Sequence, residues 1–491
     1  MMQSRRDFLR WSSTGMGALL LSDFLEAEEE SDDGYKALVV IYQAGGNDGL
    51  NMFIPSGSDA KSGYAKYAAI RDTLKVKDQA LTLTVSEGKL DLSEGNPYQS
   101  NSALEEAYTK GFYQHEGMAL STNALMPEIA HLVNSGKVAM VVNTGNLSMP
   151  STKEELQQKT KARPPFLFAH NHQTKLTMNG EASKLDFTGW AGRLYDHWME
   201  VNAGDIYGFN ISIGRSEHLF YGDKTIPLLI GKNGPTAYYR LNKEMYENTM
   251  ALTKKDRYRN LYNSKRKHSF SMQDTIVDDW KNQSPVWEGS NAYGNAFFTY
   301  PTDTQLNQKT VKADKDVLKS LKAVAKLAYI GKNRGLKRQI FFIYDGGYDT
   351  HSNQTQQHAR KLRGLSLGIG DFCLALEEMG MERDVTTFTV SDFGRSTGNN
   401  GDGTDHAWGG TYFAVGGAVN GGVYGTMPDL TLGGEDDLTK KGRLIPTTSM
   451  SQYYGTILKW FGVDESLMSV ILPELKNFKV KDLAFMTSLK S

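Results

Sequence analysis

Three short runs of apolar and β-branched residues, each followed by a loop rich in glycine and aspartate, restrict the fold most strongly. They are residues 37–42 (ALVVIY), 339–344 (QIFFIY) and 385–390 (VTTFTV). Uninterrupted runs of this kind are typical of parallel strands that are buried on both faces. Amphipathic helical patterns lie between them along the chain. The sequence therefore predicts an α/β fold, with a mostly parallel sheet flanked by helices on both faces.

Each of these runs leads into a loop that carries an aspartate. Asp48 follows the first run, Asp349 the second and Asp392 the third, while His351 and His406 lie in the loops after the second and third. The carboxyl ends of parallel strands lie at one edge of the sheet, and ligands bind at that edge in open α/β sheets. We therefore expect these side chains to converge.

Carboxylates brought together repel one another and lose hydration unless a proton or a cation compensates. Mixed sets of aspartate and histidine suit divalent metals, so we expect one or two ions of zinc, manganese, magnesium or calcium. Two such ions would clamp the attacking and leaving oxygens of a phosphoryl or sulfuryl group.

Composition excludes several other classes. The 491 residues include 55 Lys and Arg against 56 Asp and Glu, so no excess of positive charge points to nucleic acid. The single cysteine, Cys373, excludes a disulfide within the chain and zinc sites built from several thiolates. Any metal must therefore be held by carboxylate and imidazole.

The N-terminal residues 1–33 resemble a twin-arginine export signal followed by an acidic linker. Arg5 and Arg6 precede a mild apolar run over residues 11–25, which is shorter and richer in Ser and Gly than a membrane-spanning helix needs. We expect the twin-arginine translocation machinery as a partner, no stable membrane span, and a periplasmic or secreted location. The alternative is a basic tail on a cytosolic protein.

The remaining residues, 34–491, are predicted to form one large domain. Between about residues 202 and 300 the composition shifts towards Tyr, Asn and Lys, which indicates an insertion or cap on this domain.

Four motifs make the chain similar to a known family: GGNDGLN, GGYDTHSNQ, SDFGRSTGNNGDGTDHAWGG and GWAGRL. They resemble motifs of an exported bacterial family, domain of unknown function 1501, which is placed in the alkaline phosphatase-like (sulfatase-like) superfamily. The resemblance runs from about residue 35 to the C-terminus. It implies an alkaline phosphatase-like fold and a metal-dependent hydrolase whose substrate is a small phosphate or sulfate ester.

The resemblance also implies which residues bind metal. The superfamily's ligands are aspartates and histidines, and the positions that match or accompany them here are Asp48, Asp349, His351, Asp392, Asp405 and His406. Phe393 stands where the superfamily has a further histidine, so one ligand of a two-metal set would be missing.

The group that attacks the ester stays open at this point. Relatives often carry a serine where this chain has Ala169, and alanine cannot form a covalent intermediate. A hydroxyl of Ser148, Ser151 or Thr152 could attack instead, or a water activated by the metal. The remaining alternative is a non-catalytic exported binding or assembly protein that retains the fold.

Two further residues are candidate contacts for the anionic group of the substrate. They are Arg395, whose forked guanidinium matches an oxyanion, and His170, which with His172 in the same polar segment could instead bind metal or be an ordinary surface histidine. A structural salt bridge is the alternative role for Arg395.

Overall fold

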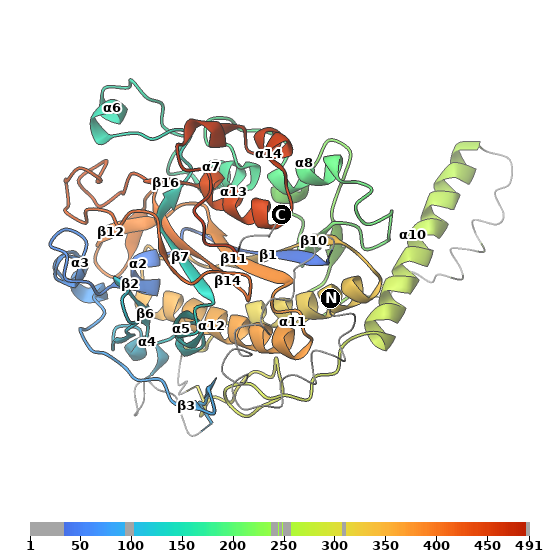
Figure 1. Cartoon of the computed structure of the whole chain (residues 1–491), viewed down its shortest axis with the longest axis horizontal. Coiled ribbons are helices and arrows are strands. Elements are labelled where there is room, and N and C mark those ends of the chain that lie inside the picture. Colours follow the sequence, from blue (N-terminus) through green and yellow to red (C-terminus); the bar gives the residue numbers. More distant parts are fainter. Residues whose placement is uncertain are drawn as a thin grey trace, which may run out of the picture. The chain divides into compact units, whose positions relative to one another are not determined.

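A large sheet forms the centre of the fold (Figure 1). The computed structural model describes residues 34–93, 103–236, 257–306 and 311–487, together with Glu244 and Asn248. Within these residues the strands of the sheet are β1 (Lys36–Ala44), β7 (Val138–Gly145), β8 (Asn210–Ile213), β9 (Leu228–Ile230), β10 (Arg338–Gly346), β11 (Val385–Ser391), β14 (Gly410–Val415), β15 (Gly422–Tyr424) and β16 (Thr448–Ser449).

The order of the strands is β15-β7-β14-β11-β1-β10-β8-β9, and β16 also pairs with β7. Every pair is parallel except the two made by β14, which runs antiparallel to β11 and to β7. The predicted α/β class with a mostly parallel sheet is therefore confirmed.

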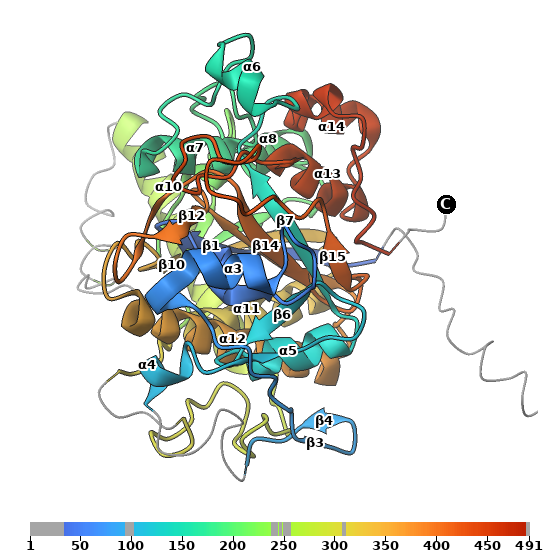
Figure 2. The same ribbon diagram turned by 90° about the vertical axis from the view of Figure 1, so that its left-hand side faces the viewer.

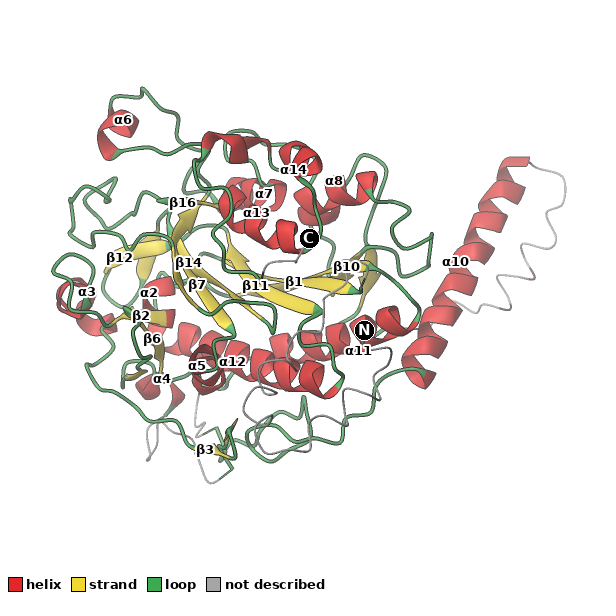
Figure 3. Cartoon of the chain, viewed as in Figure 1, coloured by secondary structure: helices red, strands yellow, loops and turns green. Residues whose placement is uncertain are grey.

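Helices cover both faces of this sheet (Figures 2 and 3). One core cluster joins the sheet to α5 (Pro127–Asn134), α11 (Asp316–Asn333) and α12 (Gln354–Glu378). The other joins it to α7 (His170–Asn179), α8 (Trp190–His197), α13 (Met450–Trp460) and α14 (Glu465–Ile471). Val39 and Ile41 of β1 pack into the first cluster, and Leu38 and Val40 into the second. This two-sided burial explains why the strand is apolar without interruption.

Smaller elements surround this core. The short helices are α2 (Gly49–Met52), α3 (Tyr64–Arg71), α4 (Leu104–Ala107) and α6 (Lys153–Gln157), with single 3₁₀ turns at Asp72–Leu74, His218–Phe220 and Pro473–Asn477. A second sheet has the order β2-β6-β5, from β2 (Phe53–Pro55), β5 (Phe112–Tyr113) and β6 (Leu120–Asn123). Two hairpins pair β3 (Val85–Ser86) with β4 (Lys89–Leu90), and β12 (Arg395–Asn399) with β13 (Thr404–His406).

The segment expected to be an insertion or cap contributes to the central sheet. Its strands β8 and β9 extend the sheet beyond β10. The long helix α10 (Arg257–Asn282) follows, and the ammonium of Lys326 on α11 lies 4.7 Å from the ring centroid of Trp280 near its end. Because β8 has only four residues and β9 only three, their residue patterns are too short to identify them as strands from the sequence.

The expected export signal, residues 1–33, lies outside the described residues. Among the helices that the structure does describe, none combines the length and apolar character needed to cross a membrane.

A buried carboxyl group on α12 makes the stability of the fold depend on pH. Asp371 is 4% exposed, and its Oδ2 accepts hydrogen bonds from the backbone N–H of Phe298 (2.6 Å) and from Asn291 Nδ2 (3.2 Å). Burial raises the pKa of Asp371 from 3.8 to about 7 despite these donors. Between pH 3.8 and about pH 7, Asp371 of the folded protein keeps a proton that the unfolded chain has released, so the free energy of unfolding falls as the pH rises.

Asp371→Asn is expected to remove this pH dependence, because an amide can accept the same hydrogen bonds without ionising. Above pH 7 the free energy of unfolding of the variant should exceed that of the natural protein by up to roughly 4 kcal/mol, and at pH 4 the two should be almost equal. Urea denaturation of both proteins at several pH values measures the difference. Parallel stability curves for the two proteins would contradict the raised pKa.

Candidate metal centre

The loops that follow β1, β10 and β11 meet at one edge of the sheet. A Cβ on Gly45 would lie 2.3 Å from the backbone nitrogen of Asp349, so only glycine allows the first two loops to approach this closely. Gly45 also has a φ of 120°, a backbone conformation that residues with a side chain rarely adopt. On the other side, Asn47 forms a parallel bridge with Gly394. The three loops are thus joined through their backbones.

Side chains from these loops and from α7 form a tight group. His170, Asp349 and His406 each offer one potential ligand atom, and these atoms lie within 4.8 Å of one another. The Nε2 atoms of His170 and His406 are 2.9 Å apart. The carboxylate of Asp349 lies 3.2 Å from His406 Nε2 and 3.4 Å from His170 Nε2. His351 adds a third imidazole, whose Nε2 is 2.8 Å from His406 Nε2 and 3.2 Å from Asp349 Oδ1. These four residues are the His/Asp cluster.

Asp392 orients one member of the cluster. Its Oδ2 accepts a hydrogen bond from His170 Nδ1 at 2.6 Å, while its Oδ1 accepts from the Tyr42 hydroxyl (2.7 Å) and the Gly45 N–H (3.0 Å). An ionised carboxylate only accepts, so Nδ1 carries the proton and, in the neutral ring, Nε2 presents its lone pair to the cluster. The bond to Asp392 also raises the pKa of His170.

The other two imidazoles are held in the same way. His406 Nδ1 donates to the backbone carbonyl of Phe168 at 2.9 Å, and His351 Nδ1 lies 3.3 Å from Asp405 Oδ1. Burial lowers the pKa of His406, which favours its neutral form. Asp405 therefore supports a histidine at the outer side of the cluster, as Asp392 does at the inner side.

Arg395 holds the carboxylate of Asp349 in place. The side chain of Arg395 is fully buried, and its Nη1 donates to Asp349 Oδ1 (2.8 Å) and to the Gly45 carbonyl (3.1 Å). Its remaining contacts are with the hydroxyl and the carbonyl oxygen of Thr404. Burial alone would raise the pKa of Asp349, but the bond from Arg395 brings it below its ordinary value. Arg395 thus forms the structural salt bridge that was the alternative to an anion contact.

The cluster's own chemistry favours a cation. Neutral rings whose Nε2 lone pairs face each other at 2.8 and 2.9 Å repel unless a proton or a cation lies between them. Ligand atoms around a tetrahedral zinc ion are roughly 3.3 Å apart, given bonds of about 2.0–2.1 Å. The separations among His170, Asp349 and His406 are 2.9, 3.2 and 3.4 Å, close to that value, so these three donors fit a single divalent ion.

Phe393 packs beneath the cluster. Its ring is buried, and its centroid lies 4.8 Å from that of His170 and 4.7 Å from that of His406. Phe393, which cannot bind metal, therefore supports the rings of His170 and His406, which can.

Asp48 has another partner. Its carboxylate is 1% exposed and receives two hydrogen bonds from Arg71 of α3, at 2.6 and 2.8 Å, and one from Gln354 Nε2 at 2.5 Å. Burial raises the pKa of Asp48, but the guanidinium outweighs it and the pKa is lowered. The structure therefore separates Asp48 from the His/Asp cluster, and a fixed internal cation neutralises it.

The hydroxyl candidates have local roles. Thr152 caps the N-terminus of α6 by accepting a hydrogen bond from the Glu155 N–H, and Ser151 Oγ donates to the Met149 carbonyl at 3.0 Å. Within the described residues neither is bonded to the cluster. His172 lies two residues after His170 in α7, so it points elsewhere and stacks on Phe166, with ring centroids 4.0 Å apart.

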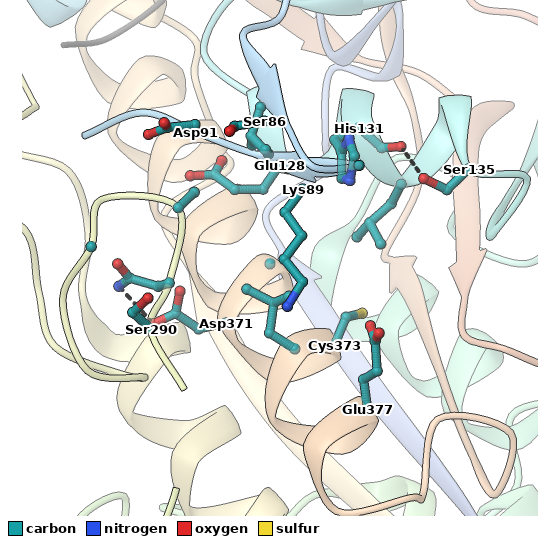
Figure 4. A pocket seen from close by; sticks show the side chains of 18 of the residues that line it. Ser86, Lys89, Asp91, Glu128, His131, Ser135, Ser290, Asp371, Cys373 and Glu377 are labelled. Carbon is teal, nitrogen blue, oxygen red and sulfur yellow. Dashed lines mark hydrogen bonds between the residues drawn. The ribbon is translucent and has the colours of Figure 1, made fainter. Parts of the chain in front are cut away.

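A separate cavity of about 420 Å³ lies between α5, α12, the β3–β4 hairpin and the loop near Asn291 (Figure 4). The side chain of Lys89 points into it, and Asp371 and Cys373 contribute to its wall. None of its lining residues belongs to the His/Asp cluster.

The fold and the cluster define an α/β protein with a histidine–carboxylate centre at the carboxyl edge of its sheet. The chain belongs to the family described as protein of unknown function (DUF1501), whose model matches residues 35–464.

No curated protein matches the chain. Among solved structures it is similar to the crystal structure of Ps i-CgsB, with 11% identity, a TM-score of 0.31, and coverage of 72% of this chain and 71% of that one. It is also similar to PsFucS1 sulfatase from Pseudoalteromonas sp., with 12% identity, a TM-score of 0.28, and coverage of 95% and 75%. At such TM-scores neither likeness indicates a function.

Arg71→Met is expected to destabilise the protein by roughly 3–5 kcal/mol, because it leaves the carboxylate of Asp48 buried without a counter-charge. Adding Asp48→Asn to this variant should restore part of the loss. Urea denaturation of the single and double variants measures both effects. Equal stability of the natural protein and Arg71→Met would show that the ion pair is not what neutralises Asp48.

Proposed function

We propose that this protein is a metal-dependent hydrolase of phosphate or sulfate esters and that its His/Asp cluster holds one divalent ion. The observation that carries the proposal is the convergence of His170 Nε2, His406 Nε2 and the Asp349 carboxylate, with His351 beside them and the Nδ1 atom of every imidazole bonded to an oxygen. Metal-binding histidines are held in this way. A set rich in imidazole favours zinc over magnesium or calcium.

We assign the ligands to His170, Asp349 and His406, because three protein ligands leave a position open for chemistry. When bound, the ion would neutralise an anionic ester oxygen and make water more acidic. Asp392 and Arg395 would position two of the ligands, since each bonds one of them from a buried site.

The cluster is open to solvent on one side. The side chains of Asp349 and His351 are both 45% exposed, whereas that of His406 is 20% exposed. Water and an ester can therefore reach the cluster from the side of His351. Because Asp405 orients His351, this imidazole is placed to accept the proton of an attacking water as general base.

Attack by water is the mechanism that suits the residues present. Ala169 precedes His170 and has no hydroxyl, and no serine or threonine side chain among the described residues is bonded to the cluster. The same observation favours the second candidate, a non-catalytic metal-binding protein of the same fold.

His406→Ala is expected to lower zinc affinity at least a hundredfold, because it removes a ligand at the centre of the cluster. His351→Ala should keep the metal but lose turnover of the ester by about 10²–10⁴-fold, the usual contribution of a general base. Titration of metal-free protein against a zinc-competing chelator, and assays of phosphate and sulfate monoesters, give the two readouts.

His197→Ala is the matched control, since His197 is exposed at the end of α8. Natural protein that takes up no divalent metal would contradict the proposal. Natural protein that binds zinc but turns over neither class of ester would support the non-catalytic candidate.

We also propose that residues 1–33 direct export through the twin-arginine translocation machinery. The support is the pair Arg5-Arg6, the apolar Phe8 and Leu9, and the mild apolar run that follows.

Replacing Arg5 and Arg6 together by lysine is expected to reduce the exported protein at least tenfold, although the charge is unchanged, because the receptor reads the arginine pair. Immunoblots of periplasmic and cytoplasmic fractions from a bacterium with this machinery measure the distribution. Arg10→Lys serves as the control, and unchanged export of the double variant would contradict the assignment.

A further inference from the structure

Arg443, near the His/Asp cluster, has a guanidinium without an ion-pair partner among the described residues. Arg443 is partly exposed and lies over the ring of Phe168, with its Cζ 4.3 Å from the ring centroid. Its Nε is buried without a hydrogen-bond partner, and its guanidinium forms no ion pair with any described residue. Because it rests on an aromatic ring and has no acid or carbonyl partner among the described residues, its planar fork is left for another group.

The position of Arg443 relates it to the metal ligands. The carbonyl of Phe168, on whose ring Arg443 lies, accepts the hydrogen bond of His406 Nδ1. Asp405, whose carboxylate lies 3.3 Å from His351 Nδ1, is also within reach of the positive charge of Arg443. Arg443 therefore lies near the side from which His351 faces solvent.

The backbone around Arg443 is held rigidly. The carboxylate of Asp437 is 1% exposed and accepts four backbone N–H bonds, one of them from Arg443 itself at 3.0 Å. The carbonyl of Gly442 accepts from Thr397 of β12 at 2.8 Å, and that of Leu444 accepts from Gly409 at 2.9 Å. These bonds attach the Arg443 segment to β12, the partner of β13, and to the loop that follows His406.

From these contacts we infer that Arg443 binds the tetrahedral oxyanion of the substrate beside the metal ion. This rests on the proposed function and assigns its anion-binding residue. Arg395 and Arg71 cannot take the role, because their guanidinium groups already bond Asp349 and Asp48. A planar fork with free N–H groups binds two oxygens of a phosphate or a sulfate at once.

The test uses the full chain loaded with zinc and titrated separately with inorganic phosphate and inorganic sulfate by calorimetry. Arg443→Gln is expected to weaken binding of the anion at least tenfold, and Arg443→Lys less, because lysine keeps the charge without the fork. Zinc stoichiometry and the thermal midpoint should not change. If the ester is turned over, KM should rise more than kcat falls. Comparing the two anions tells which class of ester the site prefers.

Arg215→Gln is the matched control. Arg215 lies over the ring of Tyr344 at 4.2 Å, but its guanidinium is already paired with Glu217 at 2.6 Å. Loss of anion binding in Arg443→Gln alone supports the inference. Equal anion affinity in Arg443→Gln and the natural protein overturns it, and so does an equal loss in Arg215→Gln, which would indicate a general effect of charge.

The outcome also separates this inference from the proposed function. If zinc binds and Arg443→Gln keeps its anion affinity, the metal assignment stands and the inference fails. If zinc does not bind, the proposed function fails and the titration is made on metal-free protein. Phosphate or sulfate binding that depends on Arg443 would then support Arg443 as an anion-binding residue without a metal beside it, and its absence would overturn the inference.

Discussion

The parallel pairing of β1 with β10 on one side and β11 on the other is the constraint on which the rest of the structure depends. In this register Tyr42 lies opposite both Tyr344 and Val390, so the three strands end at the same level. A shift by one residue would turn every buried side chain to the opposite face. The close contact of Gly45 with the backbone of Asp349 holds the loops together beyond the strands. Residues that are hundreds of positions apart in the chain become neighbours for this reason.

Buried groups control the charge at this edge. Asp392 and Arg395 each bond one member of the His/Asp cluster. Asp392 fixes the tautomer of His170, and Arg395 keeps Asp349 ionised. The buried ring of Phe393 packs against the imidazoles of His170 and His406. On this buried side an electrostatic interaction is stronger than it is in water, which would strengthen the hold of the proposed site on an ion.

Sequence reasoning predicted the central strands and their shared edge, because a strand buried on both faces leaves an uninterrupted apolar run. It could not predict the partner of Asp48, since nothing around an acid at a strand end indicates whether a guanidinium or a metal will neutralise it. It also left the role of His170 open between a metal ligand and a substrate contact, because this residue is 236 positions from His406 and only the packing of α7 on the sheet brings the two rings together. Side-chain partners across such distances leave no local pattern.

The pair formed by Arg71 and Asp48 has a consequence for the order in which the protein is assembled. A strand end whose acid carries its own permanent counter-ion does not need a metal to become compact, so the sheet and its loops can form first. The ion would then enter a preformed site from the exposed side of Asp349 and His351. Under the proposed function, loading after folding would make the availability of metal a control on activity that acts separately from folding.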